Sequence, residues 1–271
     1  MTDALTVPVP DAVPWDREMS LAVGELARFH VGALTIVVQR LANEWRATWE
    51  TTADALSMDT EAECPVTGLT LDEEGDLHRF ALRDAPGTFL LRPRLADRAV
   101  IIRPAQPFRL MPGGDVDVYV STALWVAFEL VPSGQVLFDV PVSRPSDTWF
   151  GPNTLEGELC YVSRTSARLD LVQLPLRPGR AVTRIRVENR GSSAVNLERV
   201  HLPAPELQPF IDTDGHVWTQ PVEVVLDEHG GAEVSYGSNP SRHAPAAVPV
   251  GAPRQRPERH LLPRALSALW T

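Results

Sequence analysis

The residues that could perform chemistry do not occur in the spacings that known catalytic and metal sites require. None of the seven histidines stands in a His-x-His or His-Glu-x-x-His pattern, so zinc hydrolysis is not indicated. All 25 basic residues are arginine, which excludes P-loop NTPases, protein kinases and Schiff-base enzymes because each needs a lysine. Neither Gly-x-Ser-x-Gly nor Gly-x-Gly-x-x-Gly occurs. The sequence therefore predicts no catalytic residue, no metal and no cofactor.

Two places still carry reactive side chains. Cys160 lies in a strand-like stretch, where it is either a nucleophile awaiting a distant histidine or a small buried apolar residue. Asp212 and Asp214 with His216 resemble the start of a calcium loop, but no bidentate glutamate follows, and an Asp-to-Gly β-turn is the better explanation of the stretch. A hydrolase or transferase whose groups, such as these three, converge only in the folded chain is the alternative to a non-enzymatic protein.

Aromatic residues near turns suggest a binding role. Trp149, Phe150 and Asn153 flank a turn just ahead of Cys160, and these four residues are the tentative ligand-binding set. The other interpretation is an aromatic pair that fills the junction between two β units. Exposed tryptophans on a β-sandwich could instead stack on sugar rings, which is the expectation for a carbohydrate-binding module. The tryptophans considered for that role are Trp125 and Trp218.

The composition is that of a globular protein. The chain has 271 residues, a net charge of −10 and 44% hydrophobic residues, which excludes overall disorder and a coiled coil. An acidic body repels phosphate, so no nucleic-acid partner is expected. The first fifteen residues lack the pattern of a secretory signal, and no apolar run is long enough to span a membrane. We expect a cytoplasmic protein with no membrane insertion.

Period-two alternation of apolar and polar residues dominates the chain and predicts strands. Residues 34–39 and 44–51 form one expected hairpin, and residues 124–130 and 136–142 form another around a Pro-Ser-Gly turn. Other expected strands cover residues 115–120, 158–163, 168–174, 183–188, 195–197, 200–202, 222–226 and 232–236. We predict an all-β protein with antiparallel β-sandwich architecture.

The chain divides into two packed β units and a tail. We place an N-terminal antiparallel β unit at residues 16–145, an immunoglobulin-like β unit at 146–237, and a mostly disordered Pro/Arg-rich tail at 238–271. The second unit is called immunoglobulin-like because residues 183–188, an Asn-Arg-Gly-Ser turn and a return strand read as a hairpin. The leucines and Trp270 of the last residues form either a frayed terminus or a short docking helix.

One stretch resembles a known family. The segment Thr-Trp-Phe-Gly-Pro-Asn at 148–153, Gly-Glu-Leu-Cys at 157–160 and the turn after 185–189 are similar to motifs of DUF432, an uncharacterised and mostly archaeal family. The resemblance covers roughly residues 100–230, and it departs from the family at Tyr161, where an arginine is expected. It implies a compact all-β fold and a shared feature around 149–160, and it brings no activity with it.

These observations favour a non-enzymatic binding or scaffold protein. The abundance of strands and the absence of catalytic spacings support this hypothesis. A protein partner or a second copy would associate through a sheet face or edge.

Overall fold

The computed structural model describes residues 13–54, 56–71, 75–151, 153, 155–228, 231–257 and 260–262. In these ranges the helical elements are two short 3-10 turns, η1 (Leu171–Gln173) and η2 (Ala204–Glu206), and the rest of the regular structure is strand. This confirms the all-β prediction. No helix of the described ranges is long and apolar enough to cross a membrane.

The chain forms two compact units. The first comprises Met1–Arg92 with Ala127–Asp139, and the second comprises Pro93–Val126 with Val140–Thr271. The division is therefore discontinuous in sequence, and it differs from the single boundary placed at residue 145. The reason is that the strands that contain residues 92, 127 and 139 each pass from one unit into the other without a linker.

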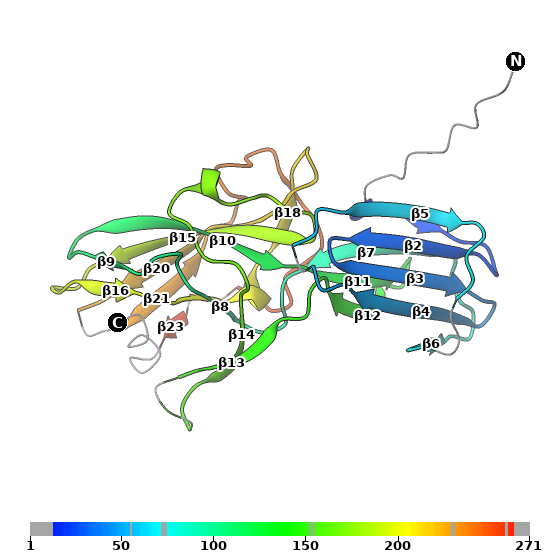
Figure 1. Cartoon of the computed structure of the whole chain (residues 1–271), viewed down its shortest axis with the longest axis horizontal. Coiled ribbons are helices and arrows are strands. Elements are labelled where there is room, and N and C mark those ends of the chain that lie inside the picture. The colour runs from blue at the N-terminus through cyan, green and yellow to red at the C-terminus, as the bar shows by residue number, and fades with distance from the viewer. Residues whose placement is uncertain are drawn as a thin grey trace, which may run out of the picture. The chain divides into compact units, whose positions relative to one another are not determined.

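The first unit contains two sheets (Figure 1). One has the order β5 (Thr60–Val66), β2 (Leu26–Val31), β3 (Leu34–Arg40), β4 (Glu44–Thr51) and β6 (His78–Ala81), all antiparallel. The other has the order β1 (Met19–Ser20), β7 (Thr88–Arg94), β11 (Trp125–Leu130) and β12 (Gln135–Pro141). The hairpin predicted from residues 34–51 is confirmed by the pairing of β3 with β4.

Aromatic side chains from both sheets make the core of this unit. Alternation along each strand points one set of side chains inward. Trp45 of β4 contacts Phe89 of β7 and Phe128 of β11, with ring centroids 5.5 and 5.1 Å apart. Phe89 and Phe128 stack at 4.6 Å. The two sheets thus enclose one apolar layer, as a β-sandwich requires.

The second unit is built around a sheet of eight strands. Its order is β22 (Val248–Pro249), β18 (Pro209–Ile211), β19 (Val217–Thr219), β15 (Arg180–Asn189), β20 (Val222–Leu226), β21 (Ala232–Tyr236) and β23 (His260–Leu262), with β10 (Asp115–Ala123) paired to β15. A four-stranded sheet has the order β13 (Ser146–Phe150), β14 (Glu158–Val162), β8 (Val100–Ile102) and β17 (Val200–Leu202). Strand β16 (Val195–Leu197) pairs with β9 (Phe108–Leu110). Figure 1 labels most of these strands.

The prediction of an immunoglobulin-like hairpin after residue 188 is wrong. β16 pairs with β9 and β17 pairs with β8, so neither strand returns along β15. Both edges of β15 are already occupied, by β10 on one side and by β19 and β20, both parallel to β15, on the other. A return strand has no free edge to join, because each strand pairs with neighbours on two sides only.

Two further expectations differ from the structure. Residues 168–174 do not form a strand: they contain η1, whose first turn is capped by the Asp170 side chain. In the expected disordered tail, the described residues 238–257 include four buried ones, Ser241, Ala244, Ala247 and Val250. Ala244 and Ala247 lie in the core with Trp218, and β22 pairs with β18. Their small apolar side chains alternate with prolines and arginines, which hides them from a composition argument. The expected C-terminal helix falls largely on residues 263–271, outside the described ranges.

Candidate functional site

The predicted ligand-binding residues lie on the hairpin of β13 and β14, on opposite faces. Trp149 stands opposite Leu159 on the outer face, and their side chains are 44% and 46% exposed. Phe150 and Cys160 point inward and are fully buried in one apolar cluster. The structure therefore does not bring the four residues together into one pocket, because neighbours along a strand point to opposite faces.

Asn153 is used to build the loop between the two strands. Its side-chain Oδ1 accepts hydrogen bonds from the backbone N–H groups of Leu155 and Glu156, and its carbonyl accepts one from Trp149 Nε1 at 2.7 Å. The loop is tight, since a Cβ atom placed on Gly151 would lie 2.1 Å from the carbonyl oxygen of Glu156. These contacts explain the Trp-Phe-Gly-x-Asn stretch as turn chemistry.

Cys160 lies beside two residues that the sequence analysis did not select. Glu158 precedes it on the same face of β14, and His201 of β17 places Nε2 2.5 Å from Glu158 Oε1. Burial, and then the Glu158 carboxylate, raises the pKa of the Cys160 thiol to about 12. A buried, protonated thiol fits the interpretation of Cys160 as a small apolar core residue better than that of a nucleophile. His201 is 43 residues from Glu158 in sequence, so no local motif could have found it.

The second acidic group serves a turn. Asp212 to Gly215 form the predicted β-turn, in which the N–H of Gly215 donates to the carbonyl of Asp212. The carboxylate of Asp212 accepts hydrogen bonds from the N–H of Asp214 and of His216 and from Trp218 Nε1. Its oxygens are thus satisfied by the protein. Trp218 is buried in the core, which rules it out as an exposed sugar platform, and Trp125 is buried too.

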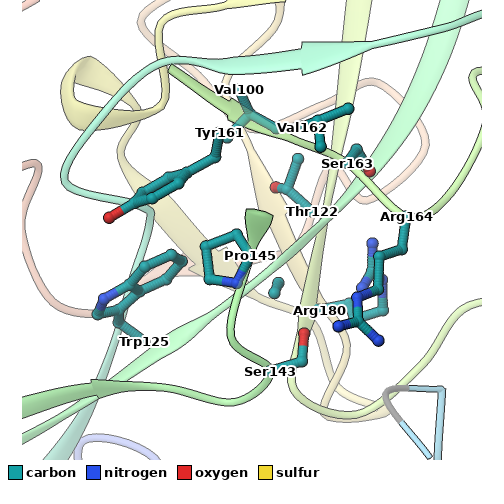
Figure 2. Close-up of a pocket in the computed structure, with 11 residues that line it drawn as sticks. Val100, Thr122, Trp125, Ser143, Pro145, Tyr161, Val162, Ser163, Arg164 and Arg180 are labelled. Carbon is teal, nitrogen blue, oxygen red and sulfur yellow. The ribbon is translucent and has the colours of Figure 1, made fainter. Parts of the chain in front are cut away.

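A hollow of the second unit lies beside Arg180, the first residue of β15. Its walls come from β10, β14 and the segment that follows β12 (Figure 2). The lining includes Arg180, Arg164, Thr122 and Ser143 on the polar side, and Trp125 and Tyr161 on the aromatic side. None of the eleven lining residues is acidic.

Arg180 is buried and firmly oriented. Its side chain is held by Ser121 and Thr165: Nε donates to Ser121 Oγ at 2.8 Å, and Nη2 donates to the Ser121 carbonyl and to Thr165 Oγ1. The residue is only 5% exposed, and within the described ranges it forms no ion pair. Burial, followed by the nearby Arg177 cation, lowers the pKa of the Arg180 guanidinium to about 10. It still carries its charge at neutral pH, in a place where an unpaired charge is unfavourable.

The rest of the hollow is preformed and small. The Thr122 hydroxyl is buried and has no hydrogen-bond partner among the described residues. The ring centroids of Trp125 and Tyr161 lie 5.8 Å apart, and the guanidinium of Arg254 lies over the Trp125 ring, 5.9 Å from its centroid. The space open to the centre of a water-sized sphere is about 30 Å³, which is about the room of two ordered water molecules. The geometry suits a small charged group.

The sequence gives no signal for this hollow. In β15, Arg180 shares its face with Arg184 and Arg186, which are partly or fully exposed, so it looks like one more polar residue of an alternating strand. Only the packing of β14 and of the segment after β12 against this end of β15 buries it.

Comparison with known proteins gives one match. The model of a family described as a protein of unknown function, DUF432, matches residues 17–269. This confirms the predicted resemblance and extends it from the middle of the chain to both units. Neither the curated proteins nor the solved structures contain a significant match.

Proposed function

The chain belongs to the DUF432 family, whose function is unknown, and we propose that it is a non-enzymatic binding protein that holds the anionic group of a ligand at Arg180. One observation carries the proposal: a buried, charged guanidinium faces a hollow that contains no carboxylate. Buried charges in proteins are normally paired, and a bound anion would supply the missing partner.

Arg180 has donors left for such an anion. Its Nε and Nη2 are engaged by Ser121 and Thr165, whereas Nη1 has no hydrogen-bond partner in the described part of the chain. Arg164 adds a second guanidinium from the exposed rim, and the Thr122 hydroxyl adds a further free donor. These donors come from β10, from β15 and from the segment after β14 and line one small space, which is the arrangement that recognises an oxyanion.

The ligand class follows from the two walls. The arginine side fits a phosphate or carboxylate group, and the room available fits only that group and not a whole metabolite. Tyr161, which is partly exposed and lies beside the buried Trp125, can cover an apolar part of the ligand at the edge of the hollow. Anionic metabolites of this kind are abundant in the cytoplasm, where we expect the protein to act.

The proposal is tested by calorimetric titration of the full chain with inorganic phosphate and with acetate. The two anions distinguish a phosphate site from a carboxylate site. Arg164→Ala changes an exposed residue, so the fold is kept, and it should weaken binding about tenfold, since a charge-assisted hydrogen bond contributes about 1.5–3 kcal/mol. Arg186→Ala is the matched control: Arg186 is an exposed arginine of β15 that pairs with Asp115 outside the hollow, and its loss should leave the affinity unchanged.

A second variant reports on the interior without removing a charge. Thr122→Val replaces the unpartnered hydroxyl by a methyl group of the same shape, which should raise the stability of the unliganded protein and weaken anion binding. The proposal is refuted if neither anion binds the wild-type protein at millimolar concentration, or if Arg164→Ala and Arg186→Ala have the same effect.

A further inference from the structure

We propose that Glu158, Cys160 and His201 form a zinc site in the second unit, separate from the anion site and not dependent on it. Glu158 and Cys160 are two residues apart in β14 and therefore project from the same face of the sheet. His201 projects from β17, on the far side of β8. The intervening strand β8 contributes Ile101 to the apolar cluster that contains Cys160, and Ala99, the residue before β8, belongs to the same cluster.

The distances fit one shared ion. Each of the three residues offers one ligand atom, and these three atoms lie within 4.8 Å of one another. Ligand atoms around tetrahedral zinc, with bonds of about 2.0–2.3 Å, lie roughly 3.3–3.8 Å from one another. The Glu158–His201 contact of 2.5 Å must open slightly to admit an ion. Glu158 can make that movement, because its side chain is 43% exposed whereas His201 is held by burial.

The two ring nitrogens of His201 have different surroundings. His201 is more than nine-tenths buried, yet its Nδ1 has no hydrogen-bond partner among the described residues. The protein thus satisfies one of the two ring nitrogens. Nδ1 points away from the Glu158 contact, so it can keep the ring proton while Nε2, which faces Glu158, offers its lone pair to the ion.

The donor set selects the metal. A thiol, an imidazole and a carboxylate are the three ligand types that zinc accepts together, whereas magnesium and calcium require oxygen ligands throughout. Three protein ligands leave a fourth position, on the exposed side where Glu158 reaches solvent. Each ion that binds displaces the proton of the Cys160 thiol to the buffer, so the Zn–S bond forms as the S–H bond breaks.

The test uses the metal-free full chain and Co²⁺ as a spectroscopic substitute for Zn²⁺. Wild type should bind one Co²⁺ with a thiolate-to-cobalt charge-transfer band in the near ultraviolet and visible bands typical of four-coordination, and added Zn²⁺ should abolish both. Cys160→Ser should lose the charge-transfer band. Cys64→Ser changes the other free cysteine, which lies in β5 of the first unit, and should retain it.

The remaining ligands are tested in the same way. Glu158→Gln and His201→Gln should each weaken Co²⁺ binding by at least about tenfold. Changing a residue that only supports a metal ligand already lowers metal affinity by about 10–100-fold, and loss of a ligand itself should cost no less. Glu156→Gln, an exposed glutamate of the same hairpin, is the matched control and should bind as wild type. Glu158→Gln changes a partly exposed side chain and should leave the protein folded. Its Co²⁺ affinity therefore tests the site even if the buried Cys160→Ser variant does not fold. A wild-type spectrum without the charge-transfer band, or a band lost in Cys64→Ser and kept in Cys160→Ser, overturns the proposal.

Discussion

Replacing Asn189 by alanine should destabilise the second unit far more than replacing a nearby surface asparagine. Asn189 ends β15 and is completely buried. Its Nδ2 donates to the carbonyls of Leu110 and Ser193 at 3.0 and 2.9 Å, and its Oδ1 accepts from the N–H of Gly191 at 3.0 Å. One side chain therefore joins the end of β9, the end of β15 and the turn that leads to β16.

The expected loss follows from these three bonds. Each hydrogen bond contributes about 0.5–1.5 kcal/mol net, and leaving a buried carbonyl without a donor adds to that, so we expect a loss of about 2–4 kcal/mol. Asn189→Asp should be at least as unfavourable, because it keeps the shape but sets a carboxylate against two carbonyl oxygens. Asn196→Ala removes a single exposed bond to Arg109 and should change stability by less than about 0.5 kcal/mol.

The measurement is urea unfolding followed by circular dichroism and tryptophan fluorescence, with the slope compared between variants. A common slope allows the midpoints to be converted into free energies. The reasoning is wrong if Asn189→Ala loses less than about 1 kcal/mol, or if it cannot be distinguished from Asn196→Ala. Either result would mean that the turn after β15 is held by its backbone alone.

Two other predictions concern packing and pH. Phe128→Ala should destabilise the first unit by about 3–5 kcal/mol, because a fully buried ring is removed from contact with Phe89 at 4.6 Å and with Phe138 at 5.2 Å. Thermal unfolding should show a much smaller effect for Phe80→Ala, because the Phe80 ring is only half-buried and its centroid lies 5.9 Å from that of Phe138. Burial, with Arg242 and Arg184 nearby and Asp117 opposing them, lowers the pKa of His243 below its usual value, while its Nε2 meets the Tyr119 hydroxyl at 2.8 Å. The unfolded chain then takes up this proton first, so stability is fully present above about pH 6.5 and declines as the pH falls through the lower folded pKa. His243→Gln should reduce that decline in urea titrations at about pH 7 and about pH 5, and an unchanged decline would contradict the assignment.

The sequence by itself determined the elements. Residues 34–39 and 44–51 became β3 and β4, and residues 222–226 and 232–236 became β20 and β21, because alternation of apolar and polar side chains is a local property with a fixed period of two. The turn from Asp212 to Gly215 was equally readable, since its hydrogen bonds lie within five residues. The family resemblance depended on the same kind of local feature, the tight loop around Asn153.

Only the tertiary structure decided which strands became neighbours, and both proposed sites depend on that choice. β16 joined β9 because β15 had no free edge. His201 reached Glu158 across a strand from far along the chain, and Arg180 became buried because segments distant in sequence closed over it. Strand pairing is settled by many small contributions from packing and hydrogen bonding summed over a whole sheet, and no short stretch of sequence contains that sum.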